Sequence, residues 1–146
     1  MTTDSTKAVD TLNEFLRGEI SAVETYRQAL EKLTASPNRT QLEVCRRSHE
    51  QRISKLKEQV RRLGGEPSQG SGAWGAFAKL VEGGAKVLGE ATAIAALEEG
   101  EDHGLKLYRG DLSNLDSASR EFVQSELLAP QVETHRAMST LKKTIS

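Results

Sequence analysis

The sequence predicts an all-α protein built as a four-helix bundle. Two observations lead to this prediction: long heptad stripes of apolar residues, and a stretch that occurs twice. Residues 18–30 read GEISAVETYRQAL and residues 100–112 read GEDHGLKLYRGDL. Both copies share Gly-Glu, six intervening residues, Tyr-Arg, two residues and Leu. The repeat indicates two related helical hairpins joined by one long connection.

The first hairpin is predicted over residues 6–63. Its first helix, residues 6–35, ends before Pro37, because the residue that precedes a proline avoids the helical region. Its heptad stripe consists of Leu12, Leu16, Glu19, Val23, Tyr26, Leu30 and Leu33. The second helix, residues 38–63, is closed by the C-cap glycines Gly64 and Gly65. Its stripe consists of Leu42, Cys45, His49, Ile53, Leu56, Val60 and Leu63.

The connection between the hairpins is predicted over residues 64–84. Its first part, GGEPSQGSGAWG at residues 64–75, has the composition of a flexible link. The following Ala- and Gly-rich stretch predicts a short extra helix over residues 73–82, broken at Gly83 and Gly84. We expect this crossover segment to lie along the bundle.

The second hairpin is predicted over residues 85–145. Its first helix, residues 85–112, has a stripe of Ile94, Leu97, Glu101, Leu105, Tyr108 and Leu112. Glycines near Glu101 weaken this helix but allow a neighbouring helix to approach closely. Its second helix, residues 117–144, contains Pro130, where we expect a kink. The stripe predicted there is Leu128, Val132, His135, Met138, Leu141 and Ile145.

Composition and charge narrow the classes of function. The 146 residues carry a formal net charge of −1, which provides no basic field for nucleic acid or anionic membrane. A single cysteine excludes an internal disulfide and any site built from several cysteines. The sequence has no run of about 18 uncharged apolar residues and no apolar signal core at its start. We therefore expect one cytoplasmic domain, residues 1–146, without nucleic-acid or membrane partners.

Four polar residues occupy the apolar stripes, one on each predicted helix: Glu19, His49, Glu101 and His135. Because an isolated buried carboxylate is strongly disfavoured, the two glutamates need partners. Two carboxylates and two imidazoles suit a divalent transition metal such as iron or manganese. They can equally satisfy one another by hydrogen bonds. The hydroxyls of Tyr26 and Tyr108 also need partners, and a stripe glutamate across the bundle is a candidate.

This arrangement resembles the ferritin and rubrerythrin superfamily, whose bundles place a Glu on each of two helices and Glu-x-x-His on the other two. More closely, residues 8–144 resemble a bacterial ferritin-like family catalogued as a domain of unknown function. The residues that carry the resemblance are Arg17-Gly18-Glu19 with Tyr26-Arg27, Leu63-Gly64-Gly65, and Leu97-Glu98-Glu99-Gly100-Glu101 with Tyr108-Arg109. The resemblance implies up-down-down-up helices with a long crossover. It implies no established activity.

The chain departs from the di-metal pattern at both bridging carboxylates. Three residues before His49 stands Arg46, and three residues before His135 stands Val132. A two-metal site needs those negative charges. We therefore hypothesise a degenerate site in which Arg46 supplies the countercharge to Glu19 or Glu101. The buried polar network predicted around them consists of Arg46, Tyr26, Tyr108, Glu98 and Glu50, although a solvated face is the alternative for both of these outer glutamates.

Three functions follow from the sequence, and none assigns a catalytic residue. The first is a non-catalytic, ferritin-derived bundle that acts through oligomerisation or an unidentified protein partner. The second is a redox or storage protein that binds iron or manganese through Glu19, His49, Glu101 and His135. The third is a helical adaptor unrelated to ferritins. A homodimer is expected, because the Ala/Gly-rich residues 73–97 offer a flat, closely packable surface.

Overall fold

The computed structural model describes residues 3–72, 89–110 and 112–145. In these ranges the chain is helical throughout its regular structure, and no strand occurs. Its elements are α1 (Thr3–Lys32), α2 (Arg39–Arg62), α4 (Glu90–Gly110), the 3-10 turn η2 (Leu112–Asn114), α5 (Ser117–Phe122), the π-helical segment η3 (Val123–Leu128) and α6 (Ala129–Ile145). The predicted all-α class and helical bundle are confirmed.

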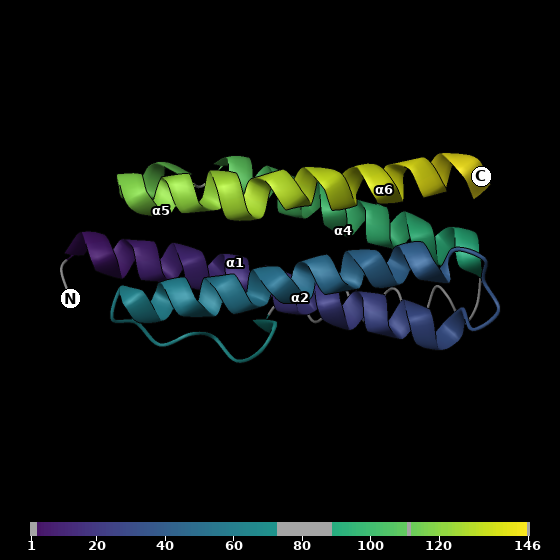
Figure 1. Cartoon of the computed structure of the whole chain (residues 1–146), viewed down its shortest axis with the longest axis horizontal. Helices are drawn as coiled ribbons and strands as arrows, with labels where there is room; N and C mark the ends of the chain where they lie inside the picture. Colours follow the sequence, from purple (N-terminus) through teal and green to yellow (C-terminus); the bar gives the residue numbers. More distant parts are fainter. Residues whose placement is uncertain (1–2, 73–88, 111, 146) are drawn as a thin grey trace.

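The helices form two hairpins that lie alongside each other (Figure 1). One hairpin pairs α1 with α2, and the other pairs α4 with α5, η3 and α6. Each helix packs more extensively on its hairpin partner than on the opposite hairpin. The contacts between the hairpins are therefore fewer than those within each hairpin, and the polar side chains among them help to hold the bundle together.

The helix ends agree with the predictions to within a few residues. Helix α1 ends at Lys32 instead of residue 35, and the Arg39 guanidinium donates to the carbonyl of Leu33 at 3.2 Å just beyond that end. Gly64 has a φ of 82°, and the Gly65 amide donates to the Val60 carbonyl at 3.0 Å, which confirms the predicted C-cap.

The first helix of the second hairpin ends two residues earlier than predicted. Helix α4 ends at Gly110, and Leu112 belongs to the following 3-10 turn. Within the described residues α4 begins at Glu90, whereas the predicted start at residue 85 lies outside them. The short helix predicted over residues 73–82 also lies outside the described residues.

The apolar core consists of two clusters, one toward each end of the bundle. One contains Ala8, Val9, Leu12, Phe15, Leu16, Leu56, Val60, Tyr108, Leu115, Val123 and Leu127. The other contains Tyr26, Ala29, Leu30, Leu42, Cys45, Ile94, Leu97 and Met138. Glu19, His49 and Glu101 fall between these clusters along their helices, each at most 3% exposed. The polar residues therefore occupy a level that apolar side chains separate from the ends of the bundle.

The last helix departs from its predicted stripe. Its buried residues are Val123, Leu127, Gln131, Thr134 and Met138. The prediction was wrong for Val132 and His135 and right for Met138, which is buried. The predicted Leu128, Leu141 and Ile145 are partly buried and pack against the core. From Leu127 onward, the buried positions Leu127, Gln131, Thr134 and Met138 keep the four-three-four spacing of an ordinary α-helical stripe. The predicted stripe followed the apolar residues and therefore missed Gln131 and Thr134, the polar residues that occupy two of these inward positions.

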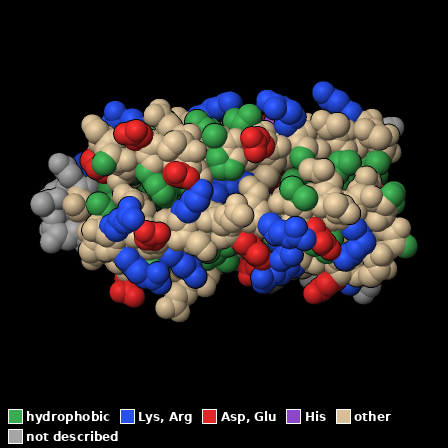
Figure 2. All heavy atoms as spheres, in the orientation of Figure 1, with side chains coloured by type: hydrophobic (Ala, Val, Ile, Leu, Met, Phe, Trp, Pro, Cys, Tyr) green, Lys and Arg blue, Asp and Glu red, His purple; other side chains and the backbone are tan. Residues whose placement is uncertain are grey.

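The surface carries charges of both signs. Figure 2 shows lysines and arginines interspersed with acidic side chains over the visible face. Several form pairs, such as Lys55 with Glu126 at 2.6 Å and Arg62 with Glu58 at 2.5 Å. Among the described residues, no helix is long and apolar enough to cross a membrane.

Candidate functional site: a buried polar network

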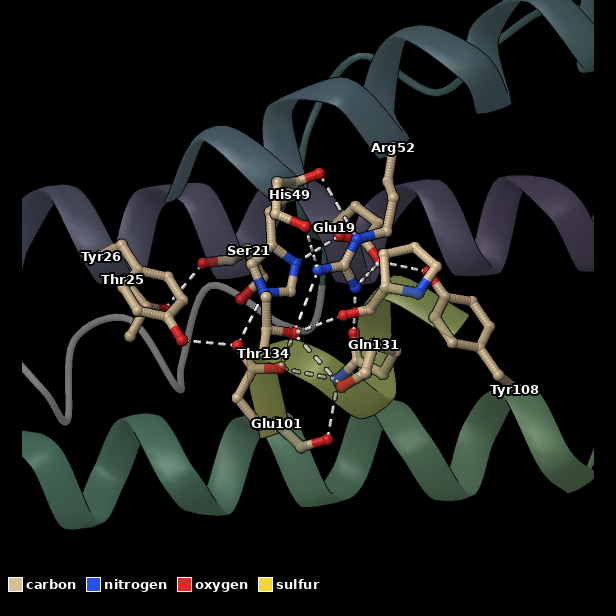
Figure 3. Close-up of polar contacts among 12 residues, drawn as sticks. Glu19, Ser21, Thr25, Tyr26, His49, Arg52, Glu101, Tyr108, Gln131 and Thr134 are labelled. Atoms are coloured by element: carbon tan, nitrogen blue, oxygen red, sulfur yellow. Dashed lines mark hydrogen bonds and ion pairs between the residues drawn. The ribbon is translucent and has the colours of Figure 1, made fainter. Parts of the chain in front are cut away.

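Eight polar side chains meet in the middle of the bundle (Figure 3). All four long helices contribute, each with two residues: Glu19 and Tyr26 from α1, His49 and Arg52 from α2, Glu101 and Tyr108 from α4, and Gln131 and Thr134 from α6. Each is buried, with an exposed fraction of 5% or less. This network is the only part of the described structure in which all four helices exchange polar contacts.

His49 lies at the centre and bridges the two glutamates. Its Nδ1 is 2.5 Å from Oε1 of Glu19, and its Nε2 is 2.7 Å from Oε2 of Glu101. Glu19 belongs to the same hairpin as His49, whereas Glu101 belongs to the other. One imidazole ring therefore connects the two hairpins through both of its nitrogens.

The two copies of the sequence repeat are cross-paired. The Tyr26 hydroxyl donates to Oε2 of Glu101 at 2.5 Å, and the Tyr108 hydroxyl donates to Oε2 of Glu19. Each tyrosine thus serves the glutamate of the other copy. The sequence prediction that these hydroxyls meet a stripe glutamate across the bundle is confirmed. The same seven-residue spacing in both copies produces this pairing, because seven residues bring the two side chains to one face.

The countercharge comes from Arg52. Its Nη1 lies 3.3 Å from Oε2 of Glu19 and also donates to the Gln131 side chain. Its Nη2 donates to Thr134 Oγ1 at 3.1 Å and to Ser48 Oγ at 3.0 Å. The guanidinium is 1% exposed and is held from three directions.

The assignment of the countercharge to Arg46 is corrected accordingly. Arg46 forms an ion pair with Glu50 at 2.8 Å on a partly exposed face, and Arg27 approaches the same carboxylate at 3.1 Å. Arg46 and Arg52 stand three residues before and after His49, so they lie about 60° to either side of it. The sequence did hold a signal for Arg52, because Cys45, His49, Arg52 and Leu56 follow spacings of four, three and four.

Two residues of α6 donate further hydrogen bonds to Glu101. Gln131 Nε2 donates to Oε1 of Glu101 at 2.9 Å and to its backbone carbonyl at 2.8 Å, and Thr134 Oγ1 donates to Oε1 at 2.7 Å. A Cβ on Gly104 would lie 2.8 Å from Gln131 Nε2. The predicted close approach of a neighbouring helix near Glu101 is thus confirmed at Gly104. Gln131 and Thr134 escaped sequence reasoning because they are polar, and the predicted stripe followed the apolar residues of this helix.

His135 does not join the network. Its ring lies at the rim of the bundle, 24% exposed, with Nε2 3.5 Å from Glu98 and 3.6 Å from Asp102. Glu98 also contacts Ser139 at 3.3 Å and Lys142 at 3.5 Å. The expected meeting of His135 with Glu19, His49 and Glu101 at one level is wrong. Glu98 and Glu50, likewise, pair outside the buried network.

The charges within the network balance. Burial alone raises the pKa of Glu19, but Arg52 and His49 outweigh it and hold this pKa below its usual value. His49 likewise lowers the pKa of Glu101 against the effect of burial. Burial and Arg52 lower the pKa of His49, yet Glu101 and Glu19 together raise it above the usual value. Two carboxylates, an imidazolium and a guanidinium sum to zero net charge.

The tyrosines and Cys45 are held neutral around this ionised centre. Burial, and next the adjacent Glu101 carboxylate, raise the pKa of Tyr26 well above its usual value. Burial and Glu19 do the same for Tyr108. Burial and Glu101 raise the pKa of the Cys45 thiol to about 11. These groups can donate hydrogen bonds near neutral pH, but they are not activated nucleophiles.

The side chains present do not fit a ferritin-type pair of metals. Both His49 nitrogens face carboxylates, the bridging positions hold Arg46 and Val132, and the Arg52 guanidinium stands beside Glu19. Across the described residues, no three His, Cys, Asp or Glu side chains are placed to hold a metal ion. A metal would have to displace a proton from His49 and compete with Arg52.

Two small cavities adjoin the network between α1 and α4. Each has a volume of about 30 Å³. One is lined by Gly18, Ser21, Ala22, Thr25, Tyr26, His49, Leu97, Gly100 and Glu101. The other touches His49, Glu19, Tyr108 and Gln131. Such volumes accommodate about one water molecule each and are too small for an organic substrate.

Residues 7–113 match a family described as "Domain of unknown function (DUF2383)". The chain belongs to this family. The segment matched to DUF2383 contains α2, α4 and all but the first residues of α1, and with them six of the eight network residues, from Glu19 to Tyr108. Gln131 and Thr134 lie beyond the matched segment. No curated protein and no solved structure matches the chain.

Proposed function

We propose that this member of DUF2383 is a ferritin-like bundle that works without a metal, as a structural or partner-binding protein. The up-down-down-up arrangement is supported by Figure 1, where α1 and α6 run toward one end and α2 and α4 toward the other. The cross-paired repeat also supports two related hairpins. The small cavities argue against turnover of an organic substrate at the network.

The observation that carries this proposal is the saturation of both carboxylates by the protein's own donors. The oxygens of Glu19 accept from His49, Arg52 and Tyr108. The oxygens of Glu101 accept from His49, Tyr26, Gln131 and Thr134. All four carboxylate oxygens therefore have partners, and the two negative charges are matched by two positive ones. Such a network stabilises one arrangement of the helices, since an unmatched buried charge costs several kcal/mol.

Metal content tests the proposal. The untagged protein would be purified without chelators, incubated with ferrous iron or Mn²⁺, desalted and subjected to elemental analysis. We expect far less than one metal per chain, together with a folded protein. About one iron, manganese or zinc per chain, lost in the double variant Glu19→Gln with Glu101→Gln, would overturn the proposal.

The second candidate function is metal-dependent redox chemistry or metal storage. One observation favours it: Glu19, His49 and Glu101 approach each other from three helices, and two tyrosine hydroxyls flank them. Carboxylates and an imidazole are suitable donors for iron or manganese once His49 gives up a proton. The positive result of the metal analysis above would favour this candidate.

Association through a second copy remains part of the proposal. Most of residues 73–97, on which the predicted homodimer rests, lie outside the described residues. Sedimentation equilibrium measures the mass in solution directly. A mass of two chains at micromolar concentration would support the homodimer, whereas a single chain at all concentrations would contradict it.

A further inference from the structure

The internal repeat extends from the first helix of each hairpin into the second. With a constant offset of 82 residues, each network residue of the first hairpin has a network residue as its counterpart in the second. The four pairs are Glu19 and Glu101, Tyr26 and Tyr108, His49 and Gln131, and Arg52 and Thr134. Buried apolar residues follow the same offset: Leu12 and Ile94, Phe15 and Leu97, Val23 and Leu105, Cys45 and Leu127, and Leu56 and Met138. The two hairpins therefore present matching faces to each other.

The hydrogen bonds of the network repeat with the same offset (Figure 3). His49 Nδ1 and Gln131 Nε2 each contact the glutamate of their own hairpin, at 2.5 Å and 2.9 Å. Arg52 and Thr134 do the same, at 3.3 Å and 2.7 Å. Each tyrosine, in contrast, donates to the glutamate of the other hairpin. The network is thus two-fold in its contacts as well as in its sequence.

The two cavities beside the network are related in the same way. Tyr26 and Glu101 line one of them, and their counterparts Tyr108 and Glu19 line the other. Gln131 lines the same cavity as Glu19. Because this cavity has a volume of about 30 Å³, only the space of about one water molecule lies between position 131 and the glutamate of the opposite hairpin.

The hairpins differ in the charge that they bring to these matching positions. Both cations of the network, His49 and Arg52, belong to the first hairpin. The counterparts in the second hairpin, Gln131 and Thr134, are neutral donors, which satisfy hydrogen bonds but leave the carboxylate charges unmatched. Since the contacts of the two sets are equivalent, the residue types alone place the positive charge on the first hairpin.

We infer that the network is a two-fold site with two alternative sets of cation positions, and that positions 131 and 134 are the second set. A histidine at position 131 would keep the contact with Glu101 and reach Glu19 across the cavity, as His49 joins the same two carboxylates from the first hairpin. An arginine at position 134 would lie beside Glu101. Two cations would still face two carboxylates, so the charges would remain balanced. The inference rests on the structural role proposed for the network.

The experiment relocates the two cations within the full chain. A cation-free variant carries His49→Gln with Arg52→Thr. The exchanged variant adds Gln131→His with Thr134→Arg to these changes. It has the same amino-acid composition as the native protein, so any difference between them arises from the positions of the cations. Circular dichroism and thermal unfolding at about pH 6 record the fold of each variant.

The matched control also starts from the cation-free variant. It adds Gln124→His with Thr140→Arg, which places the same two residue types at exposed positions of the second hairpin. The control therefore has the native composition as well. It differs from the exchanged variant only in holding its cations outside the network.

We expect the cation-free variant to lose at least about 10 °C of the native thermal midpoint, or its cooperative transition, because two buried carboxylates lack a countercharge. The exchanged variant should recover most of that loss, and the control should recover none. With ¹⁵N-labelled histidine, the native and exchanged proteins should each show one ring with two slowly exchanging N–H protons, which the control should lack. A role of positions 131 and 134 in packing alone would produce neither result.

The inference is overturned if the exchanged variant folds but is no more stable than the cation-free variant, or if the control recovers as much stability. A cation-free variant as stable as the native protein would overturn it too, because the network would then need no cation. If the exchanged variant does not fold, the smaller exchange of His49→Gln with Gln131→His decides. It must be more stable than His49→Gln alone, and equal or lower stability overturns the inference.

Failure here is distinguishable from failure of the proposed function. Metal in the native protein as purified contradicts the proposed function. A metal-free native protein whose exchanged variants gain no stability contradicts only the equivalence of the two hairpins.

Discussion

In two regions of the molecule a histidine lies between two acidic side chains. The two regions share these residue types but differ in burial and in the distances between the groups. At the centre, His49 is 3% exposed and lies 2.5 Å and 2.7 Å from Glu19 and Glu101. At the rim, His135 is 24% exposed and lies 3.5 Å and 3.6 Å from Glu98 and Asp102. His49 links the two hairpins, whereas His135 lies at the surface where α4 packs against α6.

The comparison shows that burial determines how much a charged group contributes to the stability of the fold. Water and salt screen the rim, where Lys106 and Lys142 can also exchange partners. At the centre each charge has only its protein partners, so losing one leaves another unmatched. The same residue types therefore stabilise the fold strongly in one place and weakly in the other.

Removal of the His49 imidazolium should have the largest effect on the free energy of unfolding. We expect His49→Leu to lower the free energy of unfolding by about 3–5 kcal/mol, because it leaves two buried carboxylates facing one guanidinium. His135→Leu at the rim should cost less than about 1 kcal/mol. Urea denaturation of both variants measures the difference. Equal losses would remove the distinction between the two regions.

Loss of a single hydroxyl at the centre should have an intermediate effect. Tyr26→Phe and Tyr108→Phe each remove a donor to a buried carboxylate while keeping the ring, at a cost of about 1.5–3 kcal/mol. The cross-paired repeat predicts similar losses for the two variants. Thermal unfolding by calorimetry provides the measurement. A loss for only one of them would mean that the two halves of the network are not equivalent.

The pH dependence of stability should distinguish the two histidines. Because the folded pKa of His49 is raised, its contribution is complete below about pH 6.5 and is lost as pH rises through the folded pKa. The slope between is at most about 1.4 kcal/mol per pH unit for one proton. Denaturation from pH 6 to 9 should show this decline in the native protein and in His135→Gln, and a flatter profile in His49→Gln.

The carboxylates act in the opposite direction. The folded pKa values of Glu19 and Glu101 are lowered, so their contribution is present above about pH 4.5 and is lost as pH falls through the folded values. Stability from the network is therefore greatest in the interval between about pH 4.5 and 6.5. A maximum well above pH 7 would contradict the assignment of an imidazolium to His49.

The smallest effect is expected from rim carboxylates. Glu98→Gln weakens contacts of 3.3–3.5 Å to partly exposed partners and should change stability by about 0–1 kcal/mol. Raising the salt concentration should remove most of that change. Denaturation in low and high salt tests this. A large, salt-independent loss would show that the rim belongs to the buried network.

The sequence by itself determined the helices, their hairpin pairing in the repeat, and the inward position of Glu19, His49, Glu101 and both tyrosines. These features follow from local periodicity, because a helix buries the face that bears its apolar stripe, and a polar residue at a stripe position is buried with that face. The tyrosine–glutamate pairing was also foreseeable, since a buried hydroxyl and a buried carboxylate both require partners.

Only the tertiary structure decided which cation balances those carboxylates. Arg46 and Arg52 flank His49 symmetrically in sequence, and the positions of α1 and α6 around α2 place Arg52 inward. The packing of α6 against α4 and α2 likewise brought Gln131 and Thr134 to the network and left His135 at the rim. The physical reason is that burial of a particular face depends on the neighbouring helices, and a buried polar residue is satisfied by partners on other helices that the local sequence does not reveal.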